Sequence, residues 1–182
     1  QHEARDMVPI IFHADVRRML LTQKAMIEAG RAICLANAIA IDLARHADTA
    51  EQRAAAKARE ELLTPISKAW STDMAVQVAS LGIQIHGGMG YVEDTGIAQH
   101  FRDARIAPIY EGTNGIQSID LIGRKLALDG GEAVRSFLAE VAAVAARCSG
   151  GDLQLSAIGA GLAGAHAACA EVTSWLQGAM RS

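Results

Sequence analysis

The chain has 182 residues, of which 51% are hydrophobic, 20% charged and only 4% aromatic. This length predicts one domain or slightly more, with enough residues for a core. Abundant alanine and few β-branched runs favour closely packed helices, so the composition predicts an all-α fold. A formal net charge of −3, with arginines dispersed among acids, excludes the basic surface that nucleic-acid binding requires.

The three cysteines Cys34, Cys148 and Cys169 are odd in number and form no CxxC pair. Such usage favours reduced thiols and a cytoplasmic location over a disulfide framework. No apolar run approaches the roughly 18 residues of a membrane span, and no signal peptide is visible, so no membrane partner is expected. The chain begins with Gln1 rather than Met, and we interpret it as a fragment of a longer protein.

Residues 1–9 are polar and aperiodic, and we interpret them as a leading segment. From residue 10 to residue 46 the apolar positions recur at helical spacing, which predicts one long helix. A second helical region is expected over residues 50–85, with an N-terminal signal at Thr49. Within it, Pro65 should kink the helix or split it in two.

Residues 86–93 are glycine-rich and are expected to form a loop that ends the second helix. A short helix is then expected, capped by Asp94 or Thr95 and continuing through Ile106. A third main helix should follow over residues 113–128.

The Asp-Gly-Gly sequence at 129–131 predicts a break, after which two further helices are expected over residues 132–148 and 154–177. Long helices joined by short turns are typical of an antiparallel up-and-down four-helix bundle. We therefore predict such a bundle over residues 10–128, with extra helices from the start of a C-terminal extension over residues 129–182.

Glu111 is the residue whose surroundings most favour a chemical role. It stands just before an expected helix start, where backbone N–H groups favour an anion. An apolar substrate that displaced the surrounding water would make this carboxylate a stronger base. Gly112 would let a ligand approach the backbone, and Thr113 is either the helix cap or a hydrogen-bond partner for a bound group. The alternative is a plain helix start with an incidental acid.

The turn Gln84-Ile85-His86-Gly87-Gly88 also has two interpretations. Glycines that follow a helix usually form a left-handed cap. They also allow a phosphate or flavin chain to approach the backbone closely. The strand-then-helix context of a dinucleotide-binding fold is missing, so the glycine motif of that fold does not apply.

The histidines predict no metal site. None of them occurs at a ligand spacing such as HExxH, and no metal cofactor is expected. The five that we considered are His13, His46, His86, His100 and His166.

The succession QIHGGMGY, FRDARI and IYEGTNGIQ closely resembles the C-terminal helical domain of acyl-CoA dehydrogenases. The resemblance covers roughly residues 10–128. The opening HADVRRMLLTQKA and the helical tail are similar to a longer bacterial branch of the family. That branch carries a C-terminal helical extension and includes enzymes that act on 3-methylmercaptopropionyl-CoA.

The resemblance implies a role for each residue of the segment around Glu111. Glu111 matches the catalytic base, which removes the proton α to a thioester carbonyl, and its backbone N–H matches a group that polarises this carbonyl. Gly112 matches a substrate-binding position. Thr113, Asn114 and Gly115 match a segment that contacts FAD, although many relatives have glutamine where this chain has Gly115.

The resemblance also assigns Gln84, Ile85, His86, Gly87 and Gly88 to the ADP half of an FAD bound by a neighbouring subunit. A site shared in this way implies a homo-oligomer, either a dimer or a tetramer. The charged residues Arg102, Asp103 and Arg105 match a motif that we interpret as a structural ion-pair network holding the loop.

The implied activity is the FAD-dependent conversion of an acyl-CoA to a trans-2-enoyl-CoA, with electrons passed to an electron-transfer flavoprotein. In the family, an N-terminal helical domain and a β-domain precede this region, so the fragment alone should be inactive. One alternative is a related flavoprotein of the DNA-associated stress type, which the retained Glu111 and the lack of a basic surface disfavour. The other is a purely structural helical assembly module, which self-association of the fragment would support.

Overall fold

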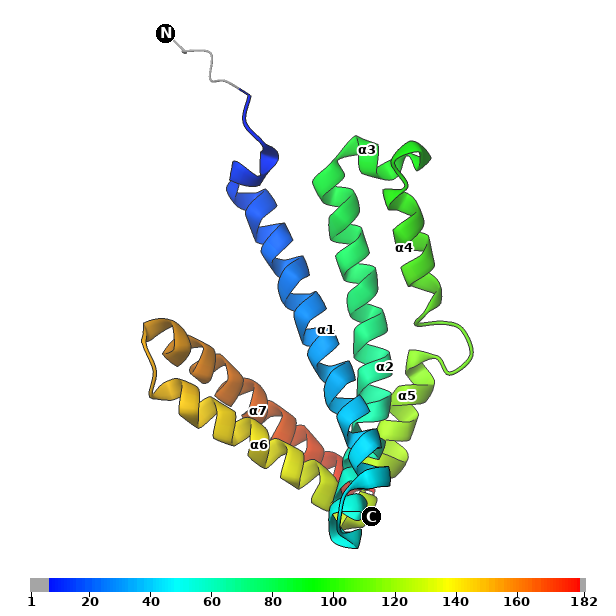
Figure 1. Cartoon of the computed structure of the whole chain (residues 1–182), viewed down its shortest axis with the longest axis vertical. Coiled ribbons are helices and arrows are strands. Elements are labelled where there is room, and N and C mark those ends of the chain that lie inside the picture. The colour runs from blue at the N-terminus through cyan, green and yellow to red at the C-terminus, as the bar shows by residue number, and fades with distance from the viewer. Residues whose placement is uncertain (1–6, 181–182) are drawn as a thin grey trace. The chain divides into compact units, whose positions relative to one another are not determined.

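The computed structural model describes residues 7–180, and within that range it contains helices and no strand (Figure 1). The predicted all-α fold is confirmed. The chain divides into two compact units, each assembled from separate stretches of sequence. The first unit contains the described residues up to Leu35 together with Ser67–Asn114, and the second contains Ala36–Ile66 and the described residues from Gly115 onward.

The first long helix, α1, spans Ala14–His46 and follows a 3₁₀ turn, η1, at Ile10–Phe12. It continues without interruption through Gly30, where the missing side chain has a packing role. A Cβ at this position would lie 2.7 Å from Cε of Met74. Glycine therefore leaves room for the Met74 side chain of the second long helix against α1 in the first unit.

The second long helix, α2, spans Ala50–His86, and the expected start signal at Thr49 is confirmed. The backbone N–H of Gln52 donates to the hydroxyl of Thr49 over 3.2 Å. The side-chain oxygen of Gln52 accepts from the backbone N–H of Thr49 over 3.1 Å. This reciprocal pair is a capping box, and it satisfies two donors that a helix start would otherwise leave unpaired.

Pro65 does not split α2, which remains one helix on both sides of it. Proline lacks the N–H that would bond to the carbonyl of Glu61, so one intrahelical hydrogen bond is lost. Burial compensates for this loss, because Pro65 is among the most completely buried residues of the chain. The Thr64 hydroxyl adds a local bond by donating to the carbonyl of Glu60 over 2.7 Å.

The expectation of a loop over residues 86–93 is wrong. This stretch contains a short helix, α3, at Gly88–Tyr91, and a 3₁₀ turn, η2, follows at Glu93–Thr95. Gly90 explains the difference, because it is buried against the end of α2 and a Cβ there would lie 2.4 Å from the carbonyl oxygen of Ile83. The next helix, α4, spans Ile97–Ile106.

The third expected helix begins as predicted but is not uniform. It starts as α5 at Asn114–Asp120 and continues as a π turn, η3, at Leu121–Lys125. In this turn the backbone N–H of Leu126 donates to the carbonyl of Leu121 over 2.9 Å. The predicted break follows, with left-handed backbone at Asp129, Gly130 and Gly131 inside the 3₁₀ turn η4, Leu128–Gly131.

The second unit contains a hairpin of two helices, α6 at Glu132–Ser149 and α7 at Leu153–Ala179, which lie side by side (Figure 1). Asp152 caps α7 by accepting hydrogen bonds from the backbone N–H groups of Gln154 and Leu155. At Gly159 a Cβ would lie 2.9 Å from the backbone nitrogen of Ser149. This glycine therefore brings the two helices into close contact.

The core of the second unit joins this hairpin to α2. Leu62 on α2 packs with Leu126 and with Val134 on α6. Phe137 and Leu176 pack against the same cluster from α6 and α7.

Helix α7 corrects the expectation that no apolar run is long enough for a membrane span. It contains a window of 18 residues with a mean hydropathy of 1.3, and 6% of that window is buried. By length and composition alone this helix could cross a membrane. One such helix is weak evidence for a membrane span.

Candidate functional site

The predicted base lies in a loop that connects α4 to α5 inside the first unit (Figure 1). We call residues 107–113 the site loop. Its first turn continues from α4, because the backbone N–H groups of Ile109 and Tyr110 both donate to the carbonyl of Ile106. The loop closes when the backbone N–H of Asn114 donates to the carbonyl of Pro108 over 3.0 Å.

Glu111 sits in this loop with an exposed side chain. Within the described part of the chain its carboxylate forms neither a hydrogen bond nor an ion pair, so it is available to a ligand. Gly112 follows with a φ of 79°, a left-handed conformation that glycine adopts without strain. The neighbouring Tyr110 is 54% exposed. The loop therefore presents a carboxylate and an aromatic ring outward.

The end of the site loop is attached to α2 through the side chain of Asn114. Its carbonyl oxygen accepts from Lys68 Nζ at 2.8 Å and from the Thr72 hydroxyl at 3.1 Å. Its amide nitrogen donates to the Ala69 carbonyl at 3.1 Å and to an Asp73 carboxylate oxygen at 2.8 Å. The Asn114 side chain, which the resemblance assigned to FAD binding, is thus engaged with α2. Its contact with FAD stays a prediction.

The start of the site loop is attached to α2 as well. Lys68 Nζ donates to the carbonyl of Ala107 over 3.1 Å and lies 5.4 Å from the centroid of the Tyr110 ring. The sequence analysis did not identify this lysine. No local pattern distinguishes it, because a single lysine on a helix usually faces solvent.

The second predicted group, Gln84 to Gly88, forms the end of α2 and the start of α3. His86 contacts the carbonyl of Gly82 through Nδ1 at 2.8 Å, which directs its ring back along the helix. Gly87 has a φ of 60°, and a Cβ built at Gly87 or Gly88 would meet nothing within 4 Å. The backbone here is open to a ligand approaching from outside.

The structure does not bring the two predicted groups together within the first unit. Helix α4 lies between them, with Gln84–Gly88 near its start and the site loop at its end (Figure 1). A helix of 10 residues is about 15 Å long, so the two groups are separated by roughly that length. The two groups can therefore contact one extended ligand only at points far apart on it. Otherwise they contact two different ligands.

The charged cluster on α4 does not hold the site loop as expected. Arg102 forms an ion pair with Glu93 at 3.3 Å and donates to the side chain of Gln99, which in turn donates to Asp103. Within the described residues no hydrogen bond or ion pair of Arg102, Asp103 or Arg105 reaches residues 107–113. The cluster is exposed and links α4 to the preceding 3₁₀ turn.

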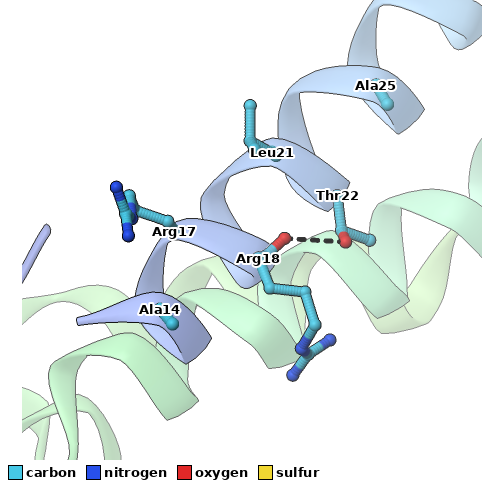
Figure 2. A pocket seen from close by; sticks show the side chains of 6 residues that line it. All are labelled: Ala14, Arg17, Arg18, Leu21, Thr22 and Ala25. Atoms are coloured by element: carbon cyan, nitrogen blue, oxygen red, sulfur yellow. Dashed lines mark hydrogen bonds between the residues drawn. The ribbon is translucent and has the colours of Figure 1, made fainter. Parts of the chain in front are cut away.

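Two surface hollows in the first unit contain no residue of either predicted group. One lies on α1, where the heads of Arg17 and Arg18 point away from each other (Figure 2). The Thr22 hydroxyl there donates to the carbonyl of Arg18 over 2.8 Å, and Arg18 pairs with Asp15. The other is a mostly apolar groove lined by α1, α2 and α4. Neither gathers polar groups around a common point.

No group of three or more histidine, cysteine or acidic side chains that could hold a metal ion occurs in the described part of the chain. The three cysteines are free thiols, with Cys34 and Cys169 exposed and Cys148 half-buried.

Comparison with known proteins places these features in one family. The sequence profile of the acyl-CoA dehydrogenase C-terminal domain matches residues 1–127. Over 167 residues, or 92% of the chain, the sequence is 52% identical to a 3-methylmercaptopropionyl-CoA dehydrogenase of Ruegeria pomeroyi. It is 42% identical over 134 residues, or 74% of the chain, to a butyryl-CoA dehydrogenase of Syntrophomonas wolfei.

The chain spans only 28% of the length of the first of these relatives and 22% of the second. The matched region nevertheless contains the site loop and the turn at the end of α2. The chain belongs to the acyl-CoA dehydrogenase family, and its residues 1–127 correspond to the C-terminal domain of that family.

Proposed function

We propose that this chain supplies the proton-abstracting base of an FAD-dependent acyl-CoA dehydrogenase, and that Glu111 is that base. The observation that carries the proposal is the exposed carboxylate of Glu111, free of partners among the described residues, in a loop attached to α2 at both ends. A general base needs an available carboxylate at a defined position, and the loop provides both.

The reaction forms a double bond between the α and β carbons of an acyl-CoA thioester. Glu111 takes the proton from the α carbon and holds it on a carboxylate oxygen. The apolar acyl chain excludes water from the carboxylate, which strengthens it as a base, and the backbone N–H of Glu111 stabilises charge on the thioester oxygen. Gly112 leaves room for the thioester, because it carries no side chain.

The residues present fit FAD at the places where its binding is proposed. The open backbone at Gly87 and Gly88 would accommodate an extended anionic chain without displacing any atom within 4 Å. Gln84 to Gly88 would hold the ADP half, and Thr113 to Gly115 would lie closer to the flavin. When bound, FAD accepts the hydride that leaves the β carbon. The length of α4 between the two groups supports the proposal that they serve different FAD molecules in a homo-oligomer.

The proposed partners are an acyl-CoA, an electron-transfer flavoprotein and further copies of the same chain. The relatives named above support a short acyl group, so 3-methylmercaptopropionyl-CoA and butyryl-CoA are the substrates to test first. The free thiols support a reducing, cytoplasmic compartment.

Replacing Glu111 by glutamine in the full-length protein should abolish the chemistry while leaving the fold intact. The amide occupies the same volume but cannot accept the α proton. We expect kcat to fall by at least about 10²- to 10⁴-fold, the usual contribution of a general base, while FAD content stays unchanged. Dye reduction with short acyl-CoA substrates measures the rate, and flavin absorbance measures the content.

The matched control is Glu93→Gln, which removes an exposed carboxylate of the same unit outside the site loop. Its activity should equal that of the unmodified protein. Substantial dehydrogenase activity in Glu111→Gln would show that another group is the base.

A further inference from the structure

We propose that Lys68 is a positioning residue for Glu111, because it donates to the backbone at the start of the site loop and to the side chain of Asn114 at its end. This inference rests on the proposed function, since it concerns how the base is held. Lys68 is not a neighbour of Glu111 in the sequence; it reaches the site loop from α2.

The two hydrogen bonds of Lys68 bracket the site loop. One goes to the carbonyl of Ala107, the first residue of the loop, over 3.1 Å. The other goes to the side chain of Asn114, the residue that follows the loop, over 2.8 Å. Glu111 lies between these two points, four residues after Ala107 and three before Asn114. A single ammonium group therefore bonds at both ends of the loop, in addition to the backbone bond from Asn114 to Pro108.

The surroundings of Lys68 differ from those of a surface lysine. Its side chain is half-buried, whereas lysines usually extend their charged heads into water. Among the described residues Lys68 forms no ion pair, and its charge faces two oxygen atoms and the ring of Tyr110 instead. The Tyr110 ring belongs to the residue directly before Glu111. The ammonium thus lies against the start of the loop, the Tyr110 ring within it and the residue that follows it.

Asn114 transmits this restraint to α2. Its amide nitrogen donates to the carbonyl of Ala69, the residue directly after Lys68, and to the carboxylate of Asp73. The Thr72 hydroxyl also donates to its carbonyl oxygen. The end of the loop therefore cannot shift without breaking several bonds to a helix of 37 residues. Lys68 extends the same anchorage to the beginning of the loop.

Loss of Lys68 would remove the hydrogen bonds to the Ala107 carbonyl and to the Asn114 side chain. The backbone at the start of the loop would then become more mobile. Displacement of a catalytic group by about 1 Å can lower a rate on the order of 10²-fold. We therefore expect the chemical step to slow, whereas substrate binding should change little. This pattern separates positioning from a general effect on folding, which would lower the amount of active enzyme but not the rate per active site.

The test compares three variants of the full-length, FAD-loaded enzyme. Lys68→Met removes the donors and keeps the apolar stem, Lys68→Arg keeps donors and charge, and Lys57→Met changes an exposed lysine of the same helix that pairs with Glu60. For each variant, kcat per bound FAD and KM are measured with an acyl-CoA substrate. The deuterium isotope effect on flavin reduction is measured with substrate labelled at the α carbon.

For Lys68→Met we expect kcat per FAD to fall about 10- to 100-fold, with KM within about threefold of the original value. The isotope effect should increase, because proton removal becomes more rate-limiting. Lys68→Arg should recover part of the loss, and Lys57→Met should match the unmodified enzyme.

An unchanged kcat per FAD and isotope effect in Lys68→Met would overturn the inference. If Lys68→Met does not accumulate as folded enzyme, Lys68→Gln replaces it with the same expected loss, because its shorter amide cannot hold both acceptors. The Glu111→Gln variant separates the two hypotheses. Activity in Glu111→Gln refutes the proposed base, whereas an inactive Glu111→Gln beside a fully active Lys68→Met refutes the role of Lys68 alone.

Discussion

The hydroxyl of Thr49 organises the first turn of α2 through more than one bond. It accepts from the backbone N–H of Gln52 in the capping box. The pKa of the Glu51 carboxyl lies below its ordinary value because the carboxylate accepts from its own backbone N–H and from the Thr49 hydroxyl. The charged form of Glu51 is therefore favoured in the folded chain, so acidification should weaken this turn only as the pH falls through that lowered pKa.

Replacing Thr49 by alanine should loosen the start of α2. Loss of an N-cap hydroxyl costs about 1 kcal/mol, which corresponds to roughly a fivefold increase in local opening. Hydrogen exchange of the backbone amides of residues 50–53 in the full-length protein measures this directly, because it reports local opening rather than global unfolding.

Thr22→Ala is the control for this variant, because the Thr22 hydroxyl bonds within α1 to the carbonyl of Arg18 and caps no helix. Exchange at residues 50–53 should be unaffected by it. Equal exchange in Thr49→Ala and the unmodified protein would mean that the capping box contributes nothing measurable.

At the scale of the elements, the corner between α2 and α3 depends on two glycines with opposite surroundings. Gly90 is buried, and a Cβ there would meet backbone atoms of Ile83, which cannot move aside. Gly88 faces open space, so a methyl group can be added without a clash. Substitutions at these two positions therefore test the packing of the corner and its proposed contact with FAD separately.

Gly90→Ala should disrupt the corner, with a loss of stability of about 1–3 kcal/mol, the usual range for overpacking. Gly88→Ala should leave the fold unchanged but reduce FAD affinity, because its methyl group occupies the space proposed for the cofactor. Hydrogen exchange over residues 84–96 measures the first effect, and FAD titration of the apoprotein measures the second. Unaltered FAD affinity in Gly88→Ala would argue against the contact proposed at this turn.

Periodicity predicted the helices well where packing follows a regular apolar stripe. The expected ends of α6 and α7 lie within two residues of the observed ones, because both ends of α6 carry a glycine and α7 begins at a capping aspartate. Periodicity failed where a single contact decides the structure. Residues 86–93 were expected to form a loop, since a run of glycines disfavours helix, but burial of Gly90 against α2 stabilises a helical turn there.

The candidate site was predicted in part for the same reason. Glu111 and Gly112 could be identified because their residue types are unusual before a helix start and match a known family. Lys68 could not, because it reaches the loop across 39 residues of sequence and a single lysine on a helix usually faces solvent. Arg102 was mispredicted in the other direction. Its dense charge cluster was expected to hold the loop, but Arg102 bonds to Gln99 and Glu93, which are near it in the sequence.

At the scale of the whole molecule, α7 needs an explanation that its own sequence does not provide. Its window of mean hydropathy 1.3 is 6% buried, yet Gly159 packs closely against the end of α6. The alignment with the relative from Ruegeria pomeroyi covers 92% of this chain, so most of the tail belongs to the matched region. We propose that α7 functions as half of a helical hairpin and does not cross a membrane.

The full-length protein should then remain in the aqueous fraction. Glu171 and His166 lie within α7, and polar side chains in the middle of a single span are unfavourable in lipid. After incubation with phospholipid vesicles and flotation through a density gradient, we expect the protein at the bottom, as in a sample without vesicles. Recovery with the floating vesicles would falsify this prediction.

The π turn at Leu121–Lys125 has a consequence for every residue that follows it. Its hydrogen bond from Leu126 to Leu121 encloses one residue more than an α-helical bond does. Because each residue of an α-helix advances by about 100°, that extra residue resets the angular position of the chain. Leu126 thereby reaches the direction that Lys125 would take in an uninterrupted helix, and it enters the core beside Leu62. A helical wheel drawn through residues 114–128 is therefore valid only on one side of Gly123 at a time.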